Sequence, residues 1–143
     1  YKHRVGTPIS AIIAQVGGLP DNAAKVISGG PMMGKAISNL DAPTLKGSSS
    51  VLFLTEEQTR RKPESNCIRC AKCVAACPMG LEPYLLNKLG KAKRYDDLEA
   101  HKVYDCIECG CCQFTCPANI PLLDTIRYAK GTVMKIMRSR PKK

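Results

Sequence analysis

The chain has 143 residues, 44% hydrophobic and 24% charged, which suits one ordinary domain or two small ones and excludes a large multidomain enzyme. Its longest apolar runs, 11–14 and 51–54, are far shorter than the roughly 20 residues that span a bilayer. It carries 22 basic and 12 acidic side chains, and all 9 cysteines lie between Cys67 and Cys116. A secreted disulfide scaffold would spread its cysteines, so the clustering predicts bound metal in a reducing compartment.

Residues 1–55 contain no cysteine and are predicted to form a small α+β module. Thr7 is the expected N-cap of a helix over 8–16, with Pro8 in its first position and Gly17-Gly18 closing it. β-prone segments predict strands at 2–5, 24–28 and 50–55. The sequence opens at Tyr1 without a Met or a signal-peptide pattern, so we expect a fragment of a longer protein.

A glycine-rich segment, residues 29–35, matches the beginning of a phosphate-binding loop. Ala36 then stands where that motif needs a hydroxyl, and Pro31 removes a backbone N–H that would cradle phosphate. We therefore interpret the segment as a tight turn, with Met32 and Met33 packed beneath it or facing a partner.

Residues 56–65 are polar and charged, contain Pro63, and are predicted to be a linker. From Asn66 onward we expect a second, mostly helical unit, with little signal for strands after Thr55. Apolar spacing predicts helices over 81–94 and 96–103 and a last one starting at Pro121.

The cysteines form two runs with the same spacing, C-x2-C-x2-C-x3-C-P. This spacing is typical of proteins with two [4Fe–4S] clusters, in which the fourth cysteine of each run ligates the other cluster. Structural zinc sites use cysteine pairs, so zinc and disulfides are weaker alternatives. Cys111 falls outside the spacing and is expected to pack rather than bind metal. The predicted ligands are Cys67, Cys70, Cys73 and Cys116 for one cluster, and Cys106, Cys109, Cys112 and Cys77 for the other.

A cluster with four thiolates moves one electron at a time and has no open coordination position, so the pattern predicts electron transfer rather than substrate turnover. Arg69 and Lys72 beside the first cluster, against Asp105 and Glu108 beside the second, would raise the first reduction potential relative to the second unless solvent screens them. The residues between Cys77 and Cys106 look helical, which favours an α-helical ferredoxin domain with an internal repeat.

The formal charge of +10 raises nucleic-acid binding as an alternative. Two oxidised clusters would contribute about −4, and few aromatic side chains are present for base stacking, so we expect no nucleic-acid partner.

Several segments together resemble the RnfC family of the Rnf electron-transport complexes. They are Gly-Thr-Pro-Ile at 6–9, Gly-Gly-Pro-Met-Met-Gly at 29–34, Lys46-Gly47 before 51–55, both cysteine runs, Ile-Pro-Leu-Leu-Asp at 120–124 and Ile-Arg-Tyr-Ala-Lys at 126–130. The glycine-methionine segment is the most specific, because many electron carriers share the cysteine runs. Cobalamin reductase of propanediol-utilising microcompartments, which has the same domain order, is the alternative.

The resemblance implies an α+β chain with a β-grasp (SLBB) module over 1–55, a ferredoxin domain with two [4Fe–4S] clusters over 66–130 and a basic tail over 131–143. It implies a peripheral place on the cytoplasmic side of the cell membrane, among the other subunits of a complex that couples electron transfer between ferredoxin and NAD⁺ to Na⁺ or H⁺ movement. The FMN and NAD(H) sites of that family belong to an N-terminal region outside this sequence.

From Arg127 onward the chain has seven basic residues and no acidic one, interleaved with apolar side chains. Such a stretch suits an anionic lipid surface or an acidic partner, and equally a solvated helix end.

Overall fold

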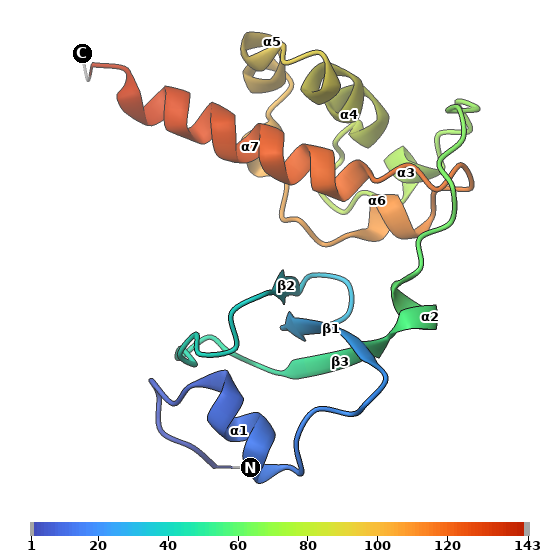
Figure 1. The fold of residues 1–143 in the computed structure, drawn as a ribbon. Helices are drawn as coiled ribbons and strands as arrows, with labels where there is room; N and C mark the ends of the chain where they lie inside the picture. The colour runs from blue at the N-terminus through green and yellow to red at the C-terminus, as the bar shows by residue number, and fades with distance from the viewer. Residues whose placement is uncertain (1, 142–143) are drawn as a thin grey trace. The chain divides into compact units, whose positions relative to one another are not determined.

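The computed structural model describes residues 2–141, which divide into two compact units with the boundary between Arg61 and Lys62. The first unit contains a helix and a small sheet, and the second is helical (Figure 1). Within the described residues no strand follows the first unit, as the sequence predicts. No described helix combines the length and apolar character needed to cross a bilayer.

The first unit is built on a three-stranded antiparallel sheet in the order β2-β1-β3. The central strand pairs with one neighbour from Val26 opposite Ile37 to Ser28 opposite Lys35, and with the other from Ala23 opposite Thr55 to Ser28 opposite Val51. Its elements are α1 (Ile9–Gln15), β1 (Ala23–Ser28), β2 (Lys35–Ile37), β3 (Val51–Thr55) and α2 (Glu56–Thr59).

Two local expectations for this unit are wrong, and the segment after β3 begins with a short helix. Residues 2–5 form no strand, because the backbone instead turns at Val5-Gly6 and bonds to the 42–44 segment through the amide of Gly6 and the carbonyl of Thr44, at 2.8 Å. The Thr7 hydroxyl bonds to the Arg4 carbonyl, so Pro8 is the N-cap of α1 and the helix begins at Ile9. The first residues of the predicted linker form the helix α2, whose N-terminus has a capping box between Thr55 and Gln58.

A tight glycine turn joins β1 to β2. The amide of Gly34 donates to the carbonyl of Gly30 at 2.8 Å, and Gly29 has the left-handed φ of 104° that favours glycine. A Cβ on Gly34 would lie 2.5 Å from both the Gly30 oxygen and Cγ2 of the buried Ile27. Gly34 therefore lets the turn pack directly on the sheet.

The second unit is organised around one long helix, α7 (Leu122–Ser139), which packs along α4 and α5 (Figure 1). The remaining elements are α3 (Lys72–Ala75), α4 (Pro83–Lys91), α5 (Tyr95–Ala100), the 3-10 turn η1 (Val103–Asp105) and α6 (Cys111–Phe114). Its core includes the fully buried side chains Leu86, Leu98, Val103, Leu122, Ile126 and Val133. Gly90 allows α4 to approach Thr125 and Ala129 of α7 closely.

An internal repeat with an offset of 39 positions relates the two halves of this unit. The offset carries Cys67 onto Cys106, α3 onto α6, and the start of α4 onto the start of α7. It also relates backbone positions with left-handed φ, such as Arg69 (55°) and Glu108 (59°). The repeat expected from the cysteine spacing therefore extends to the backbone conformation.

The glycine turn gives a stability prediction. We expect Gly34→Ala to lower the free energy of unfolding by about 1–3 kcal/mol, because the methyl group would overlap backbone and a buried side chain. Gly47→Ala is the control, since its Cβ would meet nothing within 4 Å, and it should change stability by less than about 0.5 kcal/mol. Chemical denaturation of the whole chain measures both, and equal effects would contradict the explanation.

Candidate iron–sulfur sites

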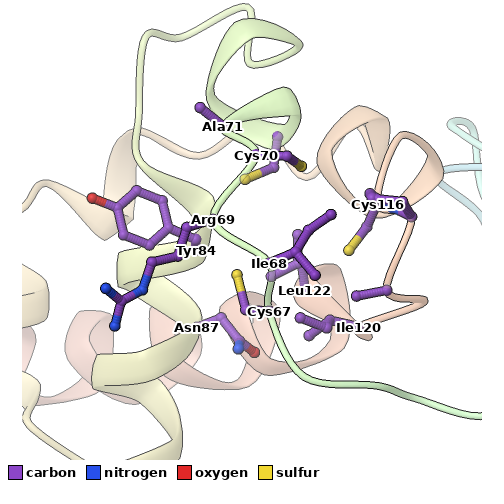
Figure 2. Close-up of a pocket in the computed structure, with 13 residues that line it drawn as sticks. Cys67, Ile68, Arg69, Cys70, Ala71, Tyr84, Asn87, Cys116, Ile120 and Leu122 are labelled. Carbon is purple, nitrogen blue, oxygen red and sulfur yellow. The ribbon is translucent and has the colours of Figure 1, made fainter.

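Four predicted ligands surround one cavity of the second unit. Cys67, Cys70 and Cys73 come from the first run and Cys116 from the end of the second, and they line a cavity of about 230 Å³. Figure 2 shows the sulfur atoms of Cys67, Cys70 and Cys116 around a common space, with α4 along one side. Segments far apart in the sequence thus meet here in the combination that the spacing predicts.

The other four predicted ligands surround a second, smaller cavity. Cys106, Cys109 and Cys112 come from the second run and Cys77 from the end of the first, around about 20 Å³. This volume admits little more than one water molecule. The four side chains would have to turn apart before a cluster could lie between them.

Left-handed backbone positions shape the loop of each run. In the first run these positions are Arg69 and Ala71, and in the second they are Glu108 and Gly110. Such residues reverse the chain within a few positions, so three cysteines of one short loop can face the same space. In the second loop the amide of Glu108 donates to Sγ of Cys106 at 3.4 Å.

Burial controls the protonation of several thiols. Burial raises the pKa of Cys73, and the backbone amide of Tyr84 partly offsets this rise. Burial also raises the pKa of Cys106, and there the backbone amide of Glu108 partly offsets the rise. It raises the pKa of Cys112 to about 12. These thiols are therefore neutral at pH 7 without a bound cation, and binding metal as thiolates must release protons.

The arrangement of the donors distinguishes one metal ion from a cluster. Among residues 2–141, no group of three or more His, Cys, Asp or Glu side chains converges closely enough to hold a single ion. Each cysteine quartet is instead distributed around a cavity, and a [4Fe–4S] cluster takes one thiolate at each of its four irons. The four-cysteine set around the first cavity therefore fits a [4Fe–4S] cluster, and the second set has the same donors around a narrower space.

Comparison with known proteins agrees with both units. Residues 59–124 match the family model of the 4Fe-4S dicluster domain, and residues 1–36 match that of the SLBB domain. The chain is 47% identical over 129 residues to the RnfC protein of the proton-translocating ferredoxin:NAD(+) oxidoreductase complex from Clostridium ljungdahlii. It is 42% identical over 131 residues to the RnfC protein of the Na(+)-translocating complex from Acetobacterium woodii.

These alignments cover 90% and 92% of the chain, but only 28% and 30% of the relatives. The chain belongs to the RnfC family. It spans less than a third of the length of these two family members. The cobalamin reductase alternative receives no support from the comparisons.

Membership in the RnfC family confirms the predicted fold class and cofactor type. The chain is an α+β protein with an SLBB domain and a 4Fe-4S dicluster domain.

The glycine-rich segment 29–35 forms the tight turn that the sequence analysis predicts. The strand β2 follows it where a phosphate-binding loop needs a helix, and the amide of Gly34 is already bonded within the turn.

The ninth cysteine, Cys111, lies outside the lining of both cavities. A hydrogen bond with the side chain of Cys109 is the largest cause that raises the pKa of the Cys111 thiol. Cys111 therefore contacts a predicted ligand and does not itself face either cavity.

The charges beside the second cavity differ from the simple pattern expected from the sequence. Glu108 forms ion pairs with Arg127 at 3.0 Å and Lys130 at 3.4 Å, and Lys130 also donates to the carbonyl of Cys106. Two cations from α7 therefore offset the carboxylate. This weakens the electrostatic difference between the two sites that Arg69 and Glu108 alone would produce.

The sequence patterns did not single out Asn87, which lines the first cavity beside the cysteines (Figure 2). The available signal was a polar residue between Leu86 and Leu89 on the apolar side of the predicted helix.

The ion pairs of Glu108 can be tested by stability. We expect Glu108→Gln to lower the free energy of unfolding by about 1 kcal/mol, because two partly buried cations lose their carboxylate. Glu64→Gln, which breaks the more exposed pair with Lys91, is the control and should cost less than about 0.5 kcal/mol. Denaturant titration measures both, and a larger loss for Glu64→Gln would be evidence against this assignment.

Proposed function

We propose that the chain carries electrons through two [4Fe–4S] clusters with crossed ligation. Cys67, Cys70, Cys73 and Cys116 hold one cluster, and Cys106, Cys109, Cys112 and Cys77 hold the other. The observation that carries the proposal is the composition of the two cavities, each lined by three cysteines of one run and one of the other. The match to a 4Fe-4S dicluster domain over 59–124 supports it.

The chemistry follows from the cysteine ligands. Bound clusters supply one-electron redox chemistry, with a charge of about −2 when oxidised and about −3 when reduced. One thiolate binds each iron of the cluster, so no iron has a free position for a substrate and this part of the chain transfers electrons. The backbone amides of Tyr84 and Glu108 donate to cysteine sulfurs and stabilise the thiolate form.

The wider assignment follows from the relatives. We propose that the chain works within a membrane-associated Rnf-type complex that couples electron transfer between ferredoxin and NAD⁺ to Na⁺ or H⁺ translocation. Its partners are then the other subunits, its place is peripheral on the cytoplasmic side, and flavin and NAD(H) bind outside residues 1–143. Within the chain, residues 1–55 are the SLBB module and residues 66–130 the electron-carrying domain.

The basic stretch from Arg127 onward contributes less free positive charge than its sequence suggests. Arg127 and Lys130 pair with Glu108, and Arg140 pairs with Glu99 at 2.8 Å and with Asp96. Lys135 and Arg138 are exposed near the end of α7, and Lys142 and Lys143 lie outside the described residues. Contact of this helix end with an anionic membrane surface remains the proposed role, with a solvated end as its alternative.

Metal and sulfide analysis tests the electron-carrier function. The chain purified without oxygen should contain about eight Fe and about eight acid-labile sulfides, because two four-iron clusters require them. The dithionite-reduced protein should show the EPR spectrum of two interacting clusters. Zinc without sulfide in a preparation protected from oxygen would overturn the proposal.

Crossed ligation predicts which cysteine variants behave alike. Cys116→Ser should damage the same cluster as Cys70→Ser, and Cys77→Ser the same cluster as Cys109→Ser, because each pair shares a cavity. EPR spectra of the four reduced variants measure this. If Cys116→Ser instead matches Cys109→Ser, each run binds its own cluster and the crossed assignment is wrong. Cys111→Ser is the control and should keep both signals.

A further inference from the structure

One polar side chain that lines the first cavity, Asn87, is buried although the described part of the structure gives its oxygen no hydrogen-bond partner. Asn87 is only 8% exposed, and its Oδ1 is buried with no hydrogen-bond partner in the described structure. Figure 2 shows its amide beside Cys67, on the side of α4 that lines the cavity. A buried amide atom without a partner costs about 1–3 kcal/mol, so this position calls for a polar partner.

The neighbouring residues of α4 show how unusual this position is. Leu86 and Leu89 are buried in the core of the second unit, and Gly90 packs against α7. A leucine at 87 would satisfy the apolar side of the helix at no polar cost. The asparagine is thus explained by what occupies the cavity rather than by packing of the helix.

The internal repeat provides a comparison within the same molecule. The offset of 39 positions carries the lining residues Cys73, Tyr84 and Asn87 of the first cavity onto Cys112, Leu123 and Ile126, which line the second. Ile126 is fully buried, with 1% of its surface exposed. The two cavities therefore share their cysteine frame but differ at this position, where one has an amide and the other a hydrocarbon.

We propose that the Asn87 amide donates a hydrogen bond to a sulfur of the cluster held by Cys67, Cys70, Cys73 and Cys116, and so holds its reduction potential above that of the other cluster. The unpartnered Oδ1 is an acceptor, but a 180° turn of the side-chain amide exchanges Oδ1 and Nδ2 and brings an N–H donor to the same place. The sulfur atoms of the cluster act only as hydrogen-bond acceptors. The reduced cluster is more negative, so the hydrogen bond is stronger in that state and favours reduction.

This inference rests on the proposed function, because it needs a cluster in the first cavity. It gives the chain an internal direction, since electrons collect on the cluster of higher potential. It also differs from the electrostatic explanation based on Arg69 and Glu108, which the ion pairs of Glu108 weaken.

The main test is an EPR-monitored redox titration of the cluster-loaded protein. Asn87→Leu keeps the size of the side chain and removes the donor. We expect the equilibrium constant for reducing one cluster to fall about tenfold, which is about 59 mV for one electron, while the other cluster stays unchanged. Asn22→Leu is the control: this exposed asparagine belongs to the first unit and lines neither cavity, so the same substitution there should shift neither potential.

A second measurement needs no variant. In protein that carries ¹⁵N only in asparagine side-chain amides, pulsed EPR of the reduced cluster should detect coupling to one nitrogen. The nearby amide of Asn119 donates to the Pro63 carbonyl at 3.3 Å and is therefore not expected to contribute. This readout decides the proposal if Asn87→Leu does not assemble clusters.

The outcomes separate the two proposals. If the unmodified chain lacks iron and sulfide, the proposed function fails. If about eight Fe are present, but Asn87→Leu leaves both potentials unchanged or the labelled protein shows no coupling, only the role of Asn87 is wrong.

Discussion

The second unit depends on one constraint: neither cysteine run can complete a set of four around a cavity by itself. Each run supplies three cysteines to one cavity and its last cysteine to the other. The end of each run must therefore lie beside the first three cysteines of the other run, and α7 packs along α4 and α5 in the same unit. Bound clusters would act as covalent links between the two halves, and loading and folding of this unit would then be coupled.

Because an internal repeat relates the two cavities, their equivalent positions can be compared directly. Equivalent backbone positions adopt left-handed φ in both loops, and equivalent helices begin at equivalent residues. The side chains then diverge. The first cavity is larger, its Cys67 and Cys70 are exposed, and it contains Asn87, whereas the second is narrow and apolar at Ile126. Such divergence would allow two clusters with the same cysteine frame to differ in reduction potential.

The first unit is stabilised in a different way. Its small sheet buries few side chains, mainly Val26 and Ile27 of β1 with Ile9 and Ile13 of α1. The close approach of the Gly29–Gly34 turn adds contacts that only glycine permits. A side chain at Gly34 would prevent this close approach, which explains why the turn needs glycine there.

The sequence alone indicated the candidate ligands and their class of chemistry, because the spacing of cysteines within a loop does not depend on how the helices pack. It also predicted the positions of β1, β3, α1, α4 and α7 from local patterns. It failed at residues 2–5 and Thr7, where hydrogen bonds to distant Thr44 and to Arg4 replace the expected strand and cap. The pairing of Glu108 with Arg127 and Lys130 and the place of Asn87 beside Cys67 depend on how α4 and α7 pack. Only the tertiary structure decided those, because contacts between segments tens of residues apart leave no periodic signal in the chain.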